Sequence, residues 1–509
     1  MLKIHSLPES EKKSALFGVC VNGVSVKPEF ARVSAMPFNT PWPGHQRDLA
    51  QTEEAAFISF ESDEKVVLDI ECSVVIERAV VRPLSKNVKA EILSEKKVRM
   101  ELTQVGNYVL EVNGIHNPLT IFFNPVRDFV SEAKQEAESG RKVYYFGAGV
   151  HNVGHMEVES NSTVTVDAGA IVYGSFSAFS AKDVKINGYG VIDGSFEIRT
   201  SETLLIPVMH KFKNAYPYFA DNKELFDEFM QETACLIGNL RFYFCENVSC
   251  EGVILRDSST FCVVPAICKN VVIDNIKTIG MWRYNSDGID IFNSTDVEVK
   301  NCFLRNFDDA MVIKGIAGWD YCNNENITID NCVIWCDWGA ACEIGAETNA
   351  PEYKNILYKN CDLIHDAGGA MMRIHHHNRA DVHHIRYENI HCEFVSDQMN
   401  AVFQNSDDQV YDYQPGSQQP QIINLVIPER IIYGRDSIKG CIHDISFKNI
   451  YLHFEDGMPV LPQIYFFGLS PKAYIENVTL EDFYVNGKKV DIATELKPRA
   501  NDYAHNIQF

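Results

Sequence analysis

The sequence predicts an all-β protein in which a right-handed parallel β-helix follows an N-terminal β-sandwich. Many short β-rich segments crowd residues 1–135, and they are separated by Asn, Gly, Pro and charged turns. Further along, a polar residue followed by Val or Ile recurs about every 23 to 33 residues with few helical patterns between the repeats. The chain is therefore divided into a sandwich domain, residues 1–135, and a β-helix domain, residues 136–509.

The N-terminal region contains four clear β segments. They are residues 55–61, 65–72, 74–83 and 107–114, which read AAFISFE, KVVLDIEC, VVIERAVVRP and NYVLEVNG. Their alternation and β-branched content predict strands of a sandwich. Nothing in these segments indicates chemistry, so we expect a packing or capping role for this domain.

Glycine-punctuated β runs begin at Lys142 and predict the opening coils of the solenoid. Two segments interrupt the repeat. Residues 198–240 show helical apolar spacing and predict an excursion from the coil, whereas the Gln, Pro and Ser content of residues 403–440 predicts a long surface loop. The last coil, residues 474–489, precedes a polar tail that we expect to cap the open end.

Polar residues recur in register along the predicted coils. The polar residue of the repeated step is Asn247, Asn270, Asp296, Asn326, Asn355, His384, Asp444 and Asn477, and a second asparagine follows at Asn275, Asn301, Asn331, Asn360, Asn389 and Asn449. We expect the side-chain amides of the second set to hydrogen-bond from coil to coil. The next residues, Cys302, Cys332 and Cys361 together with Ile276, Ile390 and Ile450, then form a buried column.

Bulk composition excludes several functions. The 509 residues carry a formal net charge of -23, which argues against nucleic acid and anionic membranes because both need clustered Lys and Arg. Fifteen cysteines without CxxC spacing disfavour a zinc ribbon or a disulfide framework. No apolar segment reaches the length of a signal peptide or a membrane-spanning helix, so we expect a cytoplasmic protein. Its oligomeric state is left open.

Three aspartates, Asp287, Asp308 and Asp309, lie in polar steps beside apolar strands about one coil apart. Stacked coils would bring their carboxyl groups together. The alternation of side chains along each predicted strand supports this stacking. The residues expected to point inward align from coil to coil: Ile289 and Ile291, Met311 and Ile313, Cys342 and Ile344, and Met372 and Ile374. The alternate residues, Asp290, Val312, Lys314, Glu343, Arg373 and His375, then share an outward surface.

Three carboxyl groups at a strand spacing of roughly 5 Å cannot all ionise freely. One keeps its proton to higher pH, and this supplies the acid and the base that glycoside hydrolysis needs. Solenoid turns are also simply rich in Asp, which would explain any one of these residues. The general abundance of Asp in turns explains the three aspartates together less well, because Asp308 and Asp309 directly precede an apolar strand, where charge is costly.

The motifs NSDGID and FDDAMVIKG resemble those of the parallel β-helix hydrolases, pectin-lyase-like solenoids that include polygalacturonases (glycoside hydrolase family 28) and dextranases and isopullulanases (family 49). Residues 108–125 and the coils after them look like the sandwich-to-helix passage of the dextranase group. The resemblance implies inverting hydrolysis of a poly- or oligosaccharide without a cofactor. It also implies that Asp308 is the general acid and that Asp287 and Asp309 position the water.

The sequence departs from polygalacturonases at two motifs. Their GHG step is Gly339-Ala340-Ala341 here, and their RIK step, which binds the substrate carboxylate, is Arg373-Ile374-His375. Loss of that lysine weakens the case for a galacturonide and favours an α-glucan, although Arg373 alone can still bind a carboxylate. Glu343 and Arg373 occupy equivalent positions on neighbouring coils, so they either pair with each other or bind sugar.

Further candidates for substrate binding are Asp290, Lys314, His375 and Trp282. Trp282 either stacks on a sugar face or packs in the core. A metal site at residues 375–377 with His383 and His384 is disfavoured, because adjacent residues of a strand face opposite sides. We expect no metal.

Two other functions remain open. A β-helix polysaccharide lyase would need a base, for which Lys314 is the nearest candidate, and a non-catalytic glycan-binding solenoid would need no acid–base group at all. The identity of the sugar and the choice of endo or exo action depend on the loops near 198–240 and 403–440, whose shape the sequence does not reveal.

Overall fold

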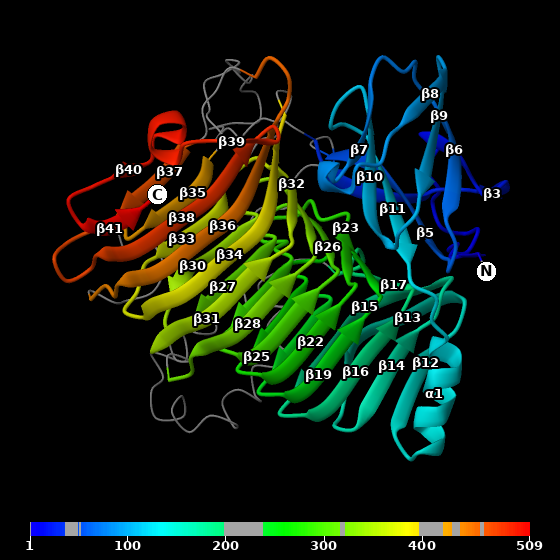
Figure 1. Cartoon of the computed structure of the whole chain (residues 1–509). Coiled ribbons are helices and arrows are strands. Elements are labelled where there is room, and N and C mark those ends of the chain that lie inside the picture. The colour runs from blue at the N-terminus through cyan, green and yellow to red at the C-terminus, as the bar shows by residue number, and fades with distance from the viewer. Residues whose placement is uncertain are drawn as a thin grey trace.

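The computed structural model describes residues 2–35, 49, 52–197, 238–315, 321–395, 421–429, 438–458 and 463–509 (Figure 1). Within these residues an N-terminal pair of sheets lies beside a long solenoid, and the predicted fold class is confirmed. The predicted helical excursion lies outside the described residues apart from its last three positions, as does most of the predicted loop at 403–440.

The N-terminal part is a sandwich of two sheets. One sheet holds β1 (Lys3–Ile4), β4 (Glu29–Ser34), β5 (Thr52–Glu61), β11 (Leu119–Asn124), β10 (Gly106–Val112) and β7 (Ala79–Arg82). The other holds β3 (Val24–Val26), β2 (Phe17–Val21), β6 (Val66–Cys72), β9 (Lys97–Leu102) and β8 (Glu91–Ser94). Alternate side chains of both sheets fill one apolar core.

A single turn, η2 (Leu84–Lys86), follows β7, and helix α1 (Phe129–Glu138) leads from the sandwich into the solenoid. Asp128 caps α1, because its carboxylate accepts a hydrogen bond from the N–H of Ser131 at 3.0 Å. Phe129 and Ala133 are buried, and α1 lies beside β12 at the first end of the solenoid (Figure 1).

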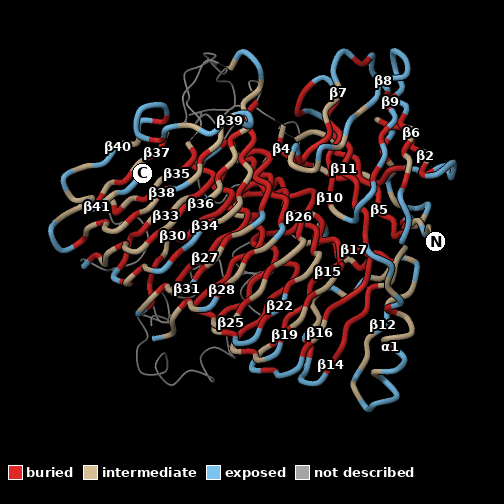
Figure 2. Tube along the Cα trace, viewed as in Figure 1, coloured by how far each residue is buried: buried red, intermediate tan, exposed pale blue. Residues whose placement is uncertain are grey.

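Each coil of the solenoid contributes to three parallel sheets. The outer sheet holds β12 (Lys142–Phe146), β14 (Ser162–Val166), β16 (Lys182–Gly188), β19 (Glu246–Glu251), β22 (Lys269–Asp274), β25 (Thr295–Lys300), β28 (Asn324–Asp330), β31 (Glu352–Lys359), β34 (Asp381–Phe394), β36 (Ile442–Phe454), β38 (Ile475–Val485) and β41 (Ala504–Gln508). Figure 2 shows the solenoid's buried interior, which is one continuous apolar core.

The inner sheet holds β17 (Val191–Asp193), β20 (Ile254–Arg256), β23 (Lys277–Ile279), β26 (Phe303–Asn306), β29 (Val333–Cys336) and β32 (Asp362–Asp366), and continues into the second halves of β34, β36 and β38. Its outward residues Phe303 and Trp335 pack on Phe57 and Phe122 of the sandwich. The sandwich therefore covers this side of the solenoid.

The third sheet is called the site sheet below. It holds β13 (Gly149–Glu157), β15 (Ala170–Phe179), β18 (Leu240–Tyr243), β21 (Val263–Ala266), β24 (Ile289–Phe292), β27 (Met311–Gly315), β30 (Cys342–Thr348), β33 (Ala370–His376), β35 (Gln421–Val426), β37 (Gln463–Phe467) and β40 (Arg499–Ala500). Ile289 pairs with Met311, Met311 with Cys342, and Cys342 with Met372. The predicted register is confirmed.

Strand β35 corrects one sequence-based expectation. Residues 421–426 fall in the predicted surface loop, yet they form a strand paired with β33 and β37. Ile422, Ile423 and Leu425 are buried, and this apolar content stabilises a further coil within a polar insertion. At the far end β39 (Lys488–Lys489) closes the last predicted coil. The polar tail after it includes η4 (Ile492–Leu496), whose terminal residues pack on the core.

Asparagine ladders follow the solenoid turns, as predicted. The Nδ2 group of Asn331 donates to Asn301 Oδ1 at 2.8 Å, and Asn389 donates to Asn360 at 2.8 Å. Aspartate interrupts the ladder, since Asn360 donates to Asp330. The ladder asparagines have positive φ, 52° at Asn331, a conformation that Asn tolerates better than other side chains do. Cys302, Cys332 and Cys361 are buried free thiols.

Asn331→Val is expected to lower the stability of the protein by about 1–2 kcal/mol more than Asn331→Gly. Both variants lose the hydrogen bond to Asn301, but only valine adds a β-branched side chain at positive φ. Urea unfolding midpoints measure the difference. Equal midpoints for the two variants would show that the left-handed backbone does not select asparagine here.

No helix among the described residues is long and apolar enough to cross a bilayer.

Candidate active site

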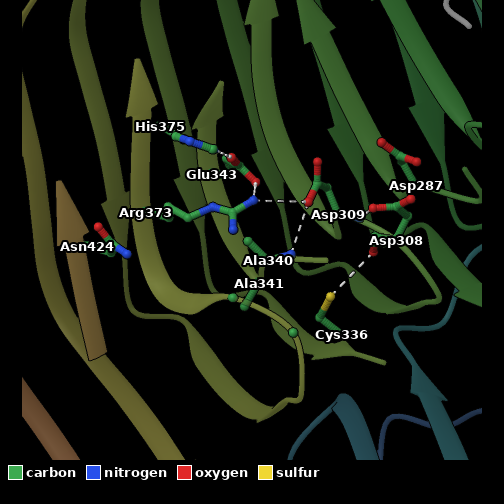
Figure 3. Close-up of polar contacts among 12 residues, drawn as sticks. Asp287, Asp308, Asp309, Cys336, Ala340, Ala341, Glu343, Arg373, His375 and Asn424 are labelled. Carbon is green, nitrogen blue, oxygen red and sulfur yellow. Dashed lines mark hydrogen bonds and ion pairs between the residues drawn. The ribbon is translucent and has the colours of Figure 1, made fainter. Parts of the chain in front are cut away.

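The three aspartates meet at one end of neighbouring strands of the site sheet. Asp287 lies just before β24, and Asp308 and Asp309 lie just before β27, which pairs with β24. One carboxylate oxygen from each residue lies within 4.8 Å of the others. Figure 3 shows the three side chains gathered on one side of the sheet.

This separation is shorter than the 6.5–9.5 Å that inverting glycosidases typically need. Two causes shorten it. Strands of neighbouring coils are only about 4.8 Å apart, and Asp308 and Asp309 lie in a bend rather than in a strand.

The next coil supports Asp309 through its backbone. The N–H of Ala340 donates to Asp309 Oδ1 at 3.0 Å, and a Cβ atom on Gly339 would lie 2.3 Å from the Asp309 nitrogen. Only glycine allows this close approach. The sequence singled out the Gly339 step as a departure from polygalacturonases, but it did not reveal this hydrogen bond, because a backbone donor leaves no residue signal.

Lys314 lies among the aspartates. Its Nζ atom is 2.9 Å from Asp287 Oδ2, 3.4 Å from Asp309 Oδ2 and 3.5 Å from Asp290 Oδ1. Burial alone would lower the pKa of Lys314, but the surrounding carboxylates raise it well above its ordinary value. A protonated lysine cannot take the proton that a lyase removes, so this geometry disfavours the lyase hypothesis.

The surroundings separate the pKa values of the three aspartates. Burial, followed by the charges of Asp287 and Asp309, raises the pKa of Asp308 well above its usual range. Burial would also raise the pKa of Asp309, but Lys314 and Arg373 outweigh burial and lower it. Burial raises the pKa of Asp287 to about 7, against the opposing charge of Lys314. A neutral carboxyl and an ionised one thus lie side by side.

Glu343 and Arg373 form an ion pair on β30 and β33. Arg373 Nη2 donates to Glu343 Oε2 at 2.6 Å and lies 3.9 Å from Asp309 Oδ1 (Figure 3). The Arg373 side chain is 23% exposed, whereas Glu343 is fully buried. Glu343 and Arg373 therefore pair with each other, which is one of the two roles that the sequence left open, and part of the Arg373 side chain still faces solvent.

The other predicted substrate-binding residues lie at different depths. Asp290 has no exposed surface and contacts Lys314. Trp282 is 4% exposed, and its indole N–H donates to Asp257 at 3.0 Å, which favours packing over stacking on a sugar. His375 is 24% exposed, and burial together with the Arg373 charge lowers its pKa to about 2. Direct substrate contacts by these residues stay predictions.

The histidines divide into separate pairs. His375 and His377 bring their Nε2 atoms to 2.9 Å, while His376 points to the other side and bonds to Thr348 at 2.9 Å. His383 and His384 approach each other although they are adjacent, because His384 has a φ of 53°. In the described part of the chain, the three aspartates form the group of metal-ligand side chains that lie close enough together to share an ion. The ammonium group of Lys314 already places a positive charge beside them.

Asn424 is a site residue that the sequence analysis missed. It pairs with Arg373 on the neighbouring strand β35, so its side chain occupies the next outward position (Figure 3). Its amide donates to Gln421 at 2.9 Å. The alternation of QIINLV could have revealed it, but the surrounding Gln and Pro residues obscured that pattern.

Two grooves, of about 600 and 510 Å³, lie elsewhere, on the outer sheet. They are lined by ladder residues such as Asn270, Asn326 and Asn355 and do not include the aspartates. The acid–base groups of the candidate site therefore lie outside both grooves.

The fold is a parallel β-helix, and its sequence matches the pattern of a glycoside hydrolase family. The pattern of the family described as "Glycosyl hydrolases family 28" matches residues 149–459, which is more than half of the chain. The chain belongs to glycosyl hydrolases family 28.

Curated relatives match over shorter segments. The chain is 28% identical over 115 residues to "Probable endopolygalacturonase D" and 28% identical over 121 residues to "Rhamnogalacturonase A", both from Emericella nidulans. These segments cover 22% and 24% of this chain, and 20% and 22% of the two relatives. The chain thus spans about a fifth of the length of these relatives.

Solved structures show the same fold over most of the chain. "Dex49A from Penicillium minioluteum" superposes with a TM-score of 0.63 at 13% identity, covering 98% of this chain and 94% of that one. An exopolygalacturonase from Thermotoga maritima gives a TM-score of 0.51 at 15% identity, covering 75% and 87%. At such identities the likeness establishes the fold alone.

Proposed function

We propose that this protein hydrolyses α-linked glycosidic bonds of a poly- or oligosaccharide with inversion, using Asp308 as acid and Asp287 and Asp309 to position water. The observation that carries this proposal is the gathering of Asp287, Asp308 and Asp309, whose carboxylate oxygens lie within 4.8 Å of one another. Burial raises the pKa of Asp308, whereas Lys314 and Arg373 outweigh burial and lower the pKa of Asp309. Glycoside hydrolysis needs this combination.

In the proposed reaction Asp308 donates its proton to the glycosidic oxygen as the bond to the anomeric carbon breaks. A water molecule held by Asp287 and Asp309 attacks the anomeric carbon and releases one proton to a carboxylate. Asp287 Oδ1 is buried and has no hydrogen-bond partner in the described structure, so a water bound beside it would supply the donor that it lacks. The products are two sugars, and one proton returns to Asp308.

Inversion is the part of this proposal that the motif resemblance supports, whereas the short carboxylate separation is typical of retaining glycosidases. NMR of the product immediately after cleavage distinguishes the two outcomes. We expect the inverted anomer. A retained anomer would instead make Asp287 or Asp309 the nucleophile of a covalent intermediate.

For the substrate we propose a neutral α-glucan. Glu343 and Asp309 already neutralise Arg373, and aspartates outnumber the single buried lysine beside them. Because Arg373 already has carboxylate partners, a uronate carboxylate gains less from it than it would from an unpaired cation. The charge of the site therefore suits a sugar without a carboxyl group.

A galacturonide is the second candidate substrate. The family match and the polygalacturonases and rhamnogalacturonase among the relatives favour it, and the part of Arg373 that faces solvent can donate to a carboxylate. In that case Arg373 carries much of the substrate affinity.

A panel of α-glucan and galacturonan oligosaccharides separates the two candidates when it is assayed with the wild type and Arg373→Gln. For an α-glucan substrate we expect KM to change by less than about threefold, because no charge pair with substrate is lost. For a galacturonide, KM should rise at least about tenfold. Arg386→Gln, on the outer sheet beside Glu388, is the matched control. Release of reducing sugar from neither class would refute the proposed hydrolysis.

A further inference from the structure

Lys314 is almost completely enclosed, and its predicted contact with substrate stays a prediction. Its side chain is 7% exposed. The ring of Phe261 lies 4.8 Å from its Nζ atom, and its backbone carbonyl accepts a hydrogen bond from Asn324 at 2.8 Å. The Lys314 side chain is therefore held on several sides by its neighbours.

The groups that face the ammonium are carboxyl groups from three coils. They are Asp287 and Asp290 from the coil of β24, Asp308 and Asp309 from the coil of Lys314 itself, and Glu347 from β30. Two more distant cations act on the same carboxyl groups, Arg373 on Asp309 and Arg241 on Asp290. One lysine thus supplies the nearest positive charge to a whole acidic cluster.

We propose that Lys314 is a positioning residue that keeps Asp287 and Asp309 ionised and oriented toward the water, with Asp290 as its buried support. This inference rests on the proposed hydrolytic function. The contacts at 2.9 and 3.4 Å direct one oxygen of each carboxylate to the ammonium. The second oxygen of Asp287 is buried without a hydrogen-bond partner, and in the proposed reaction water would supply the donor that it lacks.

Asp290 completes the arrangement from below. It is fully buried, lies 3.5 Å from Lys314 and has no other hydrogen-bond partner in the described structure. A buried carboxyl group is costly unless a cation or donor offsets the cost. The burial of Asp290 is explained if its carboxyl group holds Lys314 between Asp287 and Asp309.

The inference predicts a shift in the pH profile. Removing a cation at about 3 Å raises the pKa of a carboxylate by roughly one to three units. In Lys314→Met the water-holding carboxylates would stay protonated to higher pH, so the acidic limb of kcat/KM should move up by about one pH unit or more. Lys314→Arg keeps the charge and should keep the limb near its wild-type position. A purely structural role would lower activity without moving the limb.

A second readout needs no turnover. In protein labelled with ¹³C at the aspartate carboxyls, the signals of Asp287 and Asp309 are assigned by their loss in Asp287→Asn and Asp309→Asn. Their titration midpoints should rise in Lys314→Met and remain near the wild-type values in the control Lys359→Met, whose lysine pairs with Asp330 on the outer sheet. If the methionine variant does not fold, Lys314→Gln takes its place.

Unshifted midpoints together with an unshifted acidic limb would overturn the role of Lys314. Failure of the proposed function looks different, because the wild type would then release no sugar from any glycan while the carboxyl titration still responds to Lys314. The two readouts thus keep the two conclusions apart.

Discussion

Asp308→Asn is expected to lower kcat on the natural glycan by about 10²- to 10⁴-fold, the contribution of a well-placed general acid. Burial and the neighbouring charges of Asp287 and Asp309 raise the pKa of this carboxyl well above its usual range. Asparagine has almost the same shape but has no acidic proton to donate. The loss should therefore fall on bond breaking, with KM little changed.

The leaving group provides the diagnostic test of this loss. A glycosyl fluoride or an aryl glycoside with an acidic phenol needs little protonation, so Asp308→Asn should retain much of its activity on such substrates. Asp287→Asn and Asp309→Asn should depress hydrolysis of both substrate types, because the water loses its support. The control is Asp330→Asn, in the ladder on an outer turn.

The pH profile gives an independent result for the same residue. Activity through Asp308 is present while the carboxyl is protonated, and it is lost as the pH rises through its raised pKa. The basic limb of the kcat profile should therefore disappear in Asp308→Asn. An enzyme with full activity on the natural glycan after this substitution would assign the acid to another residue.

Arg82→Ala should cost about 3–5 kcal/mol of stability, as expected when one partner of a buried ion pair is removed. Arg82 at the end of β7 donates to Glu111 Oε2 at 2.7 Å and pairs with Glu393 of β34. The side chains of the three residues are 4%, 2% and 0% exposed. The network therefore joins the sandwich to the solenoid through buried ion pairs.

His365 of β32 extends this network, because its Nε2 atom bonds to Glu111. Burial would raise the pKa of Glu111, but His365 and Arg82 lower it to about 2. Without Arg82 the two glutamates would be buried with one cation fewer. Part of the destabilisation should thus be recovered when Glu393→Gln is added to Arg82→Ala.

Urea unfolding followed by tryptophan fluorescence measures this cost. The matched control is Arg99→Ala, also in the sandwich, whose pair with Asp69 is exposed by 47% and 28%. Its loss should change stability by no more than about 1 kcal/mol. Equal midpoints for Arg82→Ala and Arg99→Ala would contradict a stabilising role for the buried network.

Local patterns in the sequence were enough for the fold, the strand register and the gathering of the aspartates. Residue parity along β24, β27, β30 and β33 determines which side chains point inward, and the repeat length determines which residues stack. Asparagine at positive φ marks the turns. Because these features recur from coil to coil, the pattern found in one coil predicts the strand positions of the next.

Other features escaped the sequence analysis for physical reasons. Strand β35 lies within a polar insertion, so its alternation was read as a loop. Asp308 and Asp309 converge because a bend, not a strand, carries them. The N–H of Ala340 supports Asp309 without any side-chain signal.

The sequence by itself determined that three carboxyl groups meet at one edge of a parallel β-helix, since repeat length and parity are properties of the chain. Only the tertiary structure decided how those groups differ. Lys314 lies between Asp287 and Asp309, and Arg373 is drawn to Glu343. The charge state of a buried carboxyl depends on distances of 3 to 4 Å to cations on other coils and on the exclusion of water, which residue order along the chain does not specify.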